Sequence, residues 1–301
     1  MNAQNVPPKT ITPAATVILI REHAGELQIY LLKRSHKSGF MAGSFVFPGG
    51  TVDSEDRRFN IWKTHVDMDL KDISSRLGGD IPDAEALAYG ITAIRETLEE
   101  AGVFFAHRRN EINGDLERVC NMRLVEKLEK GWFIHLVAKE RWCLTVSALS
   151  RWSHWITPEL MQRRFDTRFF LASIPSGQIC RPDSRETTLG LWISPEQGLA
   201  GNLDGKIPLS PPTLITLHEL LKYSNLSELI TEANQRTWGD SLLPRLVPFD
   251  KGAVIVEPWD PMYHQKEIKI NYDQLPMSLL PVGKPFSRIW YDEGIWKPVR
   301  I

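Results

Sequence analysis

The chain has 301 residues, of which 42% are hydrophobic and 24% charged, and its formal net charge is −1. This composition predicts a globular protein with a substantial core. The neutral charge balance excludes a general electrostatic affinity for nucleic acid or for acidic membranes.

The N-terminal segment predicts a cytoplasmic protein. It lacks the apolar run of a signal peptide, and no stretch of the chain approaches the length of a membrane span. The three cysteines, Cys120, Cys143 and Cys180, are too widely spaced for a disulfide framework or a zinc cluster. Reduced thiols in a cytoplasmic protein are therefore expected.

Residues 14–34 predict a β-hairpin, because two runs of β-branched and aliphatic residues flank the turn segment EHAGE. The loop that follows, SGFMAGSFVFPGG, ends in Gly49 and Gly50. Glycines at this density serve either a tight turn or a close approach of the backbone to a ligand. The local sequence leaves both interpretations open.

Residues 83–101 predict an α-helix, with Asp83 as the N-terminal cap and Gly102 as the C-terminal stop. Apolar residues recur at helical spacing and form one stripe. At about 100° per residue, Glu96, Glu99 and Glu100 fall on the opposite side. One face is thus expected to pack while the other presents three carboxylates.

The remaining elements are predicted from composition and spacing. Residues 111–140 favour helix, and residues 144–156 and 167–173 favour strands. Residues 211–224 favour another helix, and the last residues predict a hairpin that turns at 292–294.

The three carboxylates allow two interpretations. A glutamate-rich helix face is most often exposed to solvent. Carboxylate oxygens are also the ligands that Mg²⁺ and Mn²⁺ prefer. The helix alone favours the solvated face, so the decision depends on the residues upstream.

Those upstream residues resemble the first half of a Nudix box. Gly49 is followed after five residues by Glu55, and RETLEEAGV, residues 95–103, resembles the second half. Eight of nine defined positions match, and Thr97 stands where an aliphatic residue is usual. Between Glu55 and Arg95 lie 39 residues, where the family pattern has seven.

A box split in this way is similar to one branch of the Nudix hydrolase superfamily, which includes the mammalian peroxisomal coenzyme A diphosphatase. The resemblance implies an α/β fold, an α/β/α sandwich around a mixed β-sheet. It places a Nudix domain at residues 10–225, with an insertion at 56–83 and a helical excursion at 104–143. Residues 226–301 are expected to form a C-terminal extension packed on the same domain.

The resemblance also implies roles for single residues. It makes Glu96, Glu99 and Glu100 metal ligands for Mg²⁺ or Mn²⁺, with backbone from Gly49 or Gly50 at the metal site. Arg95 would orient these carboxylates, and Glu99, Glu100 or Glu186 would act as the general base. The arginines Arg151, Arg163, Arg164, Arg168 and Arg185 are available for phosphates. The substrate-binding candidates are Arg34, Gly49, Gly50 and Arg168.

The implied activity is hydrolysis of a nucleoside diphosphate-linked small molecule, with coenzyme A or acyl-coenzyme A as the first candidate. ADP-ribose, NADH and dinucleoside polyphosphates are alternatives within the same class. A non-catalytic binding module with the same fold is a further alternative. No nucleic-acid or membrane partner is expected, and a homodimer is left open.

Overall fold

The structure is a computed structural model that describes residues 10–36, 41–79, 81–108, 115–124, 128–250 and 252–300. The strands are β1 (Ile11–His23), β2 (Glu26–Arg34), β3 (Phe45–Val46), β4 (Gly49–Thr51), β5 (Ala106–His107), β6 (Cys143–Leu144), β7 (Ser150–Ile156), β8 (Arg164–Ser173), β9 (Thr187–Ile193), β10 (Arg245–Phe249), β11 (Gly252–Val256), β12 (Arg288–Asp292) and β13 (Ile295–Val299). The helices are α1 (Phe59–Trp62), α2 (Leu70–Ile73), η1 (Ser74–Gly78), α3 (Asp83–Glu96), η2 (Thr97–Ala101), α4 (Asp115–Met122), α5 (Trp132–Glu140), η3 (Val146–Ala148), α6 (Pro195–Leu203), α7 (Pro211–Leu220), α8 (Leu226–Gln235) and η4 (Tyr272–Ser278).

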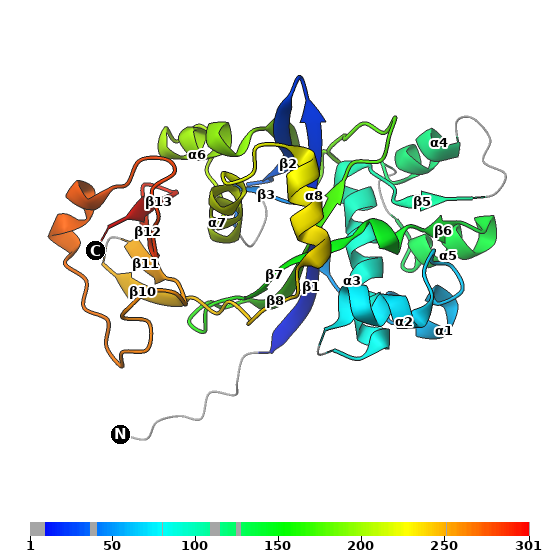
Figure 1. The fold of residues 1–301 in the computed structure, drawn as a ribbon, viewed down its shortest axis with the longest axis horizontal. Helices are drawn as coiled ribbons and strands as arrows, with labels where there is room; N and C mark the ends of the chain where they lie inside the picture. Colours follow the sequence, from blue (N-terminus) through cyan, green and yellow to red (C-terminus); the bar gives the residue numbers. More distant parts are fainter. Residues whose placement is uncertain are drawn as a thin grey trace.

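A mixed sheet of seven strands lies at the centre of the molecule (Figure 1). Strand β1 lies between the antiparallel β2 and the parallel β8, and β7 pairs with β8 at the edge. The strand β4, which carries both glycines of the loop, pairs with the first half of β1. The predicted hairpin is confirmed, and it turns at Ala24 and Gly25, whose φ angles of 52° and 79° suit a two-residue turn.

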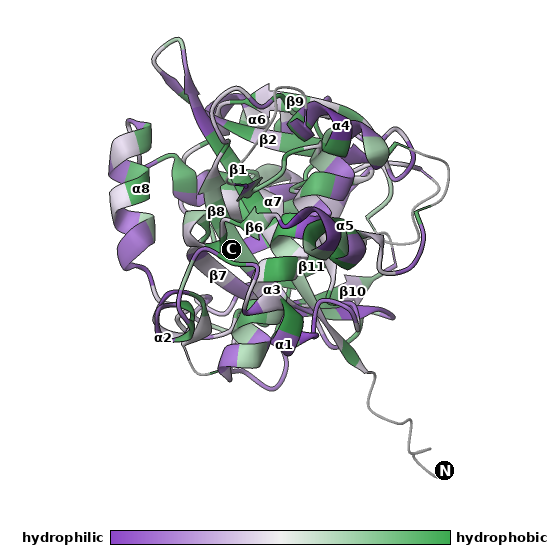
Figure 2. Ribbon diagram, turned by 90° about the vertical axis from the view of Figure 1, so that its right-hand side faces the viewer, coloured by the Kyte–Doolittle hydropathy of each residue, from purple (hydrophilic) through white to green (hydrophobic). Residues whose placement is uncertain are grey.

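The alternation of side chains along β1 divides the interior into two cores. Val17 and Leu19 point toward α3 and pack with its apolar stripe. Ile18 and Ile20 point to the other face, where α6 and α7 pack. Helices therefore cover both faces of the sheet, and the predicted α/β class is confirmed. Figure 2 shows hydrophobic residues along the central strands and within the helices around them.

The helix that carries the three carboxylates differs from the predicted α-helix. It is α-helical from Asp83 to Glu96 and then continues as one π-helical turn, Thr97–Ala101. A π turn pairs residue i with i+5 and shifts the side chains that follow it, and such turns are frequent at functional sites. The predicted stop is confirmed, because Gly102 ends the helix in the left-handed conformation with φ of 69°.

The insertion and the later excursion both lie on the α3 side of the sheet. The insertion forms α1, α2 and η1, and its Trp62 is buried against Phe133 of α5. The expected single helical stretch at 111–140 is instead two helices, α4 and α5. Residues 109–114 and 125–127 of that stretch lie outside the described residues.

The C-terminal residues form α8 and a separate sheet of four strands in the order β10-β11-β12-β13. The predicted terminal hairpin is confirmed as β12 and β13. Leu242 joins this region to the central sheet, since it exchanges backbone hydrogen bonds with His154 (2.7 Å) and Ile156 (2.8 Å) of β7. The domain boundary at residue 225 stays a prediction. Among the described residues, no helix combines the length and the hydrophobicity that a membrane crossing requires.

Candidate active site

Arg95 lies at the centre of a cluster of carboxylates at the end of α3. Its Nη1 donates to Glu96 Oε1 (2.8 Å) and to Glu99 Oε2 (3.0 Å). Its Nη2 donates to the carbonyl oxygen of Thr51 (2.9 Å) on β4. Arg95 therefore links the two glutamates to the strand that follows the glycine loop.

Asp56 holds the other side of the Arg95 guanidinium, and it comes from the first residues of the insertion. Its Oδ2 accepts from Arg95 Nη2 at 2.8 Å, and its Oδ1 accepts from Arg95 Nε at 3.0 Å. Thr92 Oγ1 and the Asp53 amide also donate to Asp56, each at 2.9 Å. Asp56 is only 1% exposed, so this is a buried and fully hydrogen-bonded ion pair.

The neighbouring Glu55, which the sequence pattern singled out, does not contact Arg95. Its carboxylate pairs with Arg58 at 3.2 Å near the surface, and its carbonyl accepts from the indole of Trp62. The buried partner of Arg95 is thus Asp56, one position after Glu55. Sequence spacing could not separate these adjacent acids, because the insertion begins between the two halves of the motif.

Burial dominates the electrostatics of the three glutamates. It raises the pKa of Glu96 to about 8, although Arg95 opposes the shift. Burial likewise raises the pKa of Glu99 and raises that of Glu100 well above its usual value. For Arg95, burial lowers the pKa, but the charges of Glu96 and Asp56 outweigh it and raise the pKa overall. The cluster thus holds more carboxyl groups than one guanidinium can pair with, and burial favours their neutral form.

The two glycines of β4 act at close range on the carboxylates. The Gly49 amide donates to Glu100 Oε2 at 3.0 Å. A Cβ atom on Gly50 would lie 2.4 Å from Glu96 Oε1, a distance at which one of the two groups must move. Close approach of the backbone to the site therefore explains these glycines, and a turn alone does not.

Glu186 reaches the same site from the loop before β9. Asp183 organises that loop, because its carboxylate accepts from the amides of Glu186 (3.1 Å) and Thr187 (2.9 Å). The buried Arg123 ties the loop to the end of the helix: its Nη1 donates to the Glu99 carbonyl at 2.8 Å and its Nη2 donates to the Arg181 carbonyl. The glutamate thus has a fixed backbone position beside the helix acids.

Two further residues of the site were not predicted from the sequence. The indole of Trp132, on α5, donates to Glu99 Oε1 at 2.9 Å. Asp53 lines the site between β4 and the insertion. No local pattern marks either residue, because both reach the helix through tertiary packing.

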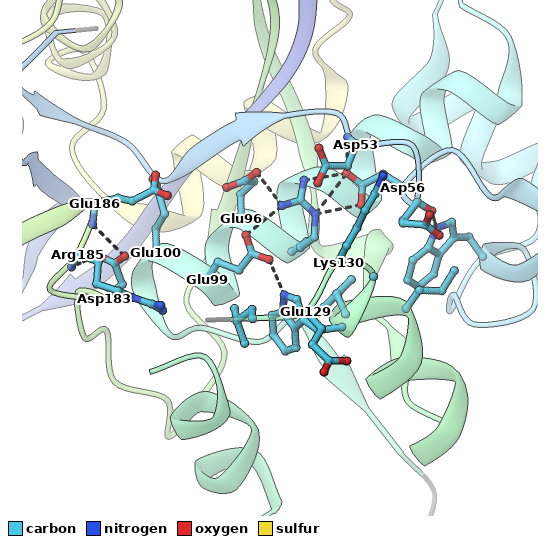
Figure 3. A pocket seen from close by; sticks show the side chains of 18 residues that line it. Asp53, Asp56, Glu96, Glu99, Glu100, Glu129, Lys130, Asp183, Arg185 and Glu186 are labelled. Atoms are coloured by element: carbon cyan, nitrogen blue, oxygen red, sulfur yellow. Dashed lines mark hydrogen bonds and ion pairs between the residues drawn. The ribbon is translucent and has the colours of Figure 1, made fainter. Parts of the chain in front are cut away.

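Two cavities meet at this cluster. A cavity of about 340 Å³ opens toward the insertion and α5, and Figure 3 shows Glu96, Glu99 and Glu100 facing it together with Asp53 and Glu186. A larger cavity of about 540 Å³ extends from the same acids along the other face of the sheet. The residues that line both cavities are Asp53, Arg95, Glu96, Glu99, Glu100 and Glu186.

The structure brings some of the predicted substrate-binding residues to the site and leaves another away from it. Arg34, Gly49 and Gly50 line the larger cavity. Arg168 lines neither cavity; it is buried between the rings of Tyr89 and Trp238, on the α3 face of β8. Its side chain packs in the first core, so the position of Arg168 does not support phosphate binding.

The carboxylates at the end of α3 are candidate ligands for a divalent cation. Among the described residues, no three His, Cys, Asp or Glu side chains converge into a ready-made ion site. Glu96 and Glu99 converge on Arg95 instead. The chemistry of the donors nevertheless fits a hard cation, since three glutamates from one helix end are buried or partly buried beside a single guanidinium, and carboxylate oxygens are the ligands that such a cation prefers.

Comparison with known proteins gives consistent results. The family model of the NUDT19 Nudix domain matches residues 8–220. The chain is 28% identical to the acyl-coenzyme A diphosphatase NUDT19 of Xenopus laevis, over 91% of this chain and 83% of that protein. It is also 28% identical to the acyl-coenzyme A diphosphatase NUDT19 of Homo sapiens, over 94% of this chain and 84% of that protein. A NUDIX hydrolase from Alicyclobacillus acidocaldarius shares the fold, with a TM-score of 0.57 and 22% identity over 74% of this chain and 96% of that chain.

Proposed function

The chain belongs to the NUDT19 Nudix family, and from this premise we propose that it hydrolyses the diphosphate of coenzyme A or acyl-coenzyme A. The products are 3′,5′-ADP and phosphopantetheine or its acyl derivative. The observation that carries this proposal is the position of Glu96, Glu99 and Glu100, which lie where two cavities meet. A diphosphate at these acids leaves one cavity for each arm of the substrate.

Other diphosphates are the second candidates. The same acids suit ADP-ribose, NADH or a dinucleoside polyphosphate, because each contains a phosphoanhydride between two larger groups. The similarity to acyl-coenzyme A diphosphatases favours coenzyme A, since it extends beyond the Nudix domain to 91% of this chain. A binding module without catalysis is disfavoured, because all three helix glutamates and Arg95 are retained.

In the proposed reaction, water attacks one phosphorus of the diphosphate. The bond between that phosphorus and the bridging oxygen breaks, and the bridging oxygen leaves with the other phosphoryl group. A carboxylate accepts the proton of the water, and Glu99, Glu100 and Glu186 all line both cavities. Arg95 orients Glu96 and Glu99 through its two hydrogen bonds, and the Gly49 amide orients Glu100.

We propose Mg²⁺ or Mn²⁺ as the cofactor, held by Glu96, Glu99 and Glu100 beside the backbone of Gly49. When bound, the cation neutralises charge on the diphosphate oxygens and lowers the pKa of a water molecule. A neighbouring cation would also lower the raised pKa values of these carboxylates, because it favours their charged form. We keep the cytoplasmic location and the absence of nucleic-acid partners as predictions from the sequence. A homodimer is left open.

The test is a hydrolysis panel with Mg²⁺ and with Mn²⁺, covering coenzyme A, acetyl-coenzyme A, ADP-ribose, NADH and diadenosine tetraphosphate. We expect turnover of the coenzyme A compounds that a chelator abolishes. Glu99→Gln should lower kcat by on the order of 10²-fold or more, equivalent to roughly 3 kcal/mol of barrier. Glu196→Gln, an exposed acid on α6, is the matched control.

Two outcomes would contradict the proposal at different levels. Preferential cleavage of ADP-ribose would overturn the substrate assignment and leave the hydrolase intact. If no compound is cleaved and Glu99→Gln behaves as the native protein, the chain is not a diphosphatase.

A further inference from the structure

We infer that the larger cavity binds the acyl-pantetheine arm of the substrate and that the C-terminal sheet sets the preference for acyl-chain length. This inference rests on the proposed function and extends it. It concerns residues outside the segment matched by the Nudix family model, which ends at residue 220.

The two cavities differ in their lining. Beyond the residues that both share, the smaller one is lined by acidic and basic side chains, among them Asp183, Lys130 and Arg185 (Figure 3), and its acids outnumber its bases. The larger one is lined mainly by apolar side chains beyond the acids, such as Phe47, Trp155 and Phe169. The acyl-pantetheine arm of the proposed substrate, which is the less charged one, therefore fits the larger cavity.

The C-terminal sheet adds a wall to the larger cavity. Pro244, Leu246, Ile255 and Trp296 line it from that side. Across from them, Thr16 and Phe169, which are register partners on β1 and β8, line it from the central sheet. The apolar part of the cavity is therefore a space between two sheets.

The register of the C-terminal strands shows that this wall is one face of the C-terminal sheet. Leu246 on β10 lies directly opposite Ile255 on β11, so both side chains point the same way. They pack in the second core together with Trp296. The next residue along β10, Val247, points to the other face and packs in a third, separate cluster.

Hydrogen bonds of Asn202 attach this sheet to the Nudix fold. Asn202 Nδ2 of α6 donates to the Trp296 carbonyl at 2.8 Å, and this contact is buried. The same Asn202 accepts from the Leu209 amide at 2.9 Å, just before α7. The wall is thus held at a fixed distance from the acids, which a residue that measures chain length requires.

The apolar arm is recognised by burial of its methylene groups. Each buried methylene strengthens binding by about fourfold. The affinity for an acyl chain that extends past Phe169 toward Leu246 and Ile255 therefore rises with each methylene until the cavity is filled.

The experiment changes the size of Leu246, which is only partly buried on the edge strand β10 and so tolerates substitution. We expect Leu246→Phe to lower kcat/KM for palmitoyl-coenzyme A about tenfold relative to free coenzyme A. Leu246→Ala should move the optimal chain length upward, measured on coenzyme A esters of 2 to about 16 carbons. Ile255→Val, which removes one methyl group, provides a second and milder variant of the same face.

Val247→Ala is the matched control on the same strand, and it should leave the ratio of long-chain to free coenzyme A unchanged. A ratio that stays constant in all Leu246 and Ile255 variants overturns the inference while the proposed function stands. Equal effects on palmitoyl-coenzyme A, coenzyme A and ADP-ribose would assign the apolar cavity to the nucleotide and also overturn it. If the native protein cleaves no coenzyme A compound, the proposed function fails first and the inference falls with it.

Discussion

Replacing Asp56 by asparagine should destabilise the protein far more than the same change at the adjacent Glu55. The Asp56 carboxylate accepts hydrogen bonds from Arg95, from Thr92 and from the Asp53 amide. In Asp56→Asn the amide nitrogen faces donors, and Arg95 loses a buried partner. The charge of Arg95 then depends on Glu96 and Glu99 alone.

The expected size of the effect follows from burial. The side chains of Arg95 and Asp56 are 9% and 1% exposed. Breaking a buried ion pair by removing one partner costs about 3–5 kcal/mol. The side chains of Arg58 and Glu55 are 55% and 29% exposed, and a surface pair of this kind contributes about 0–1 kcal/mol.

The assay is urea unfolding of both variants and the native protein, followed by tryptophan fluorescence. The free energy of unfolding should fall by about 3–5 kcal/mol in Asp56→Asn and by less than about 1 kcal/mol in Glu55→Gln. Diphosphatase activity should fall with the first change only, because Arg95 orients two of the helix glutamates. A larger loss for Glu55→Gln would refute the assignment of Asp56 as the buried partner of Arg95.

Two further predictions concern positions away from the substrate. Gly102→Ala should lower the melting temperature more than Gly25→Ala. Both glycines have positive φ, but a Cβ atom at Gly102 would lie 2.7 Å from a nitrogen of Arg123, whereas a Cβ atom at Gly25 would have no neighbouring atom within 4 Å. The left-handed conformation alone costs about 1–2 kcal/mol, so an equal loss at the two glycines would show that Arg123 adapts freely. Glu257→Gln should stabilise the protein increasingly as the pH rises, because burial raises the pKa of Glu257 well above its usual value. Glu257 ionises above about pH 4.3 in the unfolded chain but stays protonated in the folded one, so the free energy of unfolding of the native protein falls by up to about 1.4 kcal/mol per pH unit. Urea titrations from pH 5 to 8 measure this, and a constant difference between the variant and the native protein would contradict the prediction.

Much of the fold could be predicted from local patterns. The hairpin of β1 and β2, the stop of the helix at Gly102 and the terminal hairpin all depend on residues close together in the chain. The α/β class followed from the resemblance carried by the two halves of the motif. The two hairpins and the end of the helix depend on short-range interactions: turn chemistry, capping and side-chain periodicity.

The parts that could not be predicted depend on long-range packing. The π turn at Thr97–Ala101 leaves no periodic signal, and Thr97 occupies an aliphatic position there because its hydroxyl donates to the Ala93 carbonyl at 2.7 Å. Trp132 reaches Glu99 from a helix more than thirty residues away. Arg168 suited a phosphate by its charge, but its position on β8 turns it toward the rings of the first core.

The backbone pairing of Leu242 with β7 also concerns the outer edge of the central sheet. β7 is the last strand of the central sheet, and a bare outer strand offers unpaired amides and carbonyls to another chain. Leu242 takes up the Ile156 amide and the His154 carbonyl of that strand. The C-terminal region therefore pairs with part of an exposed strand edge. A chain that ended after α8 would lack this pairing, and β7 would be open to pairing with another chain and to aggregation.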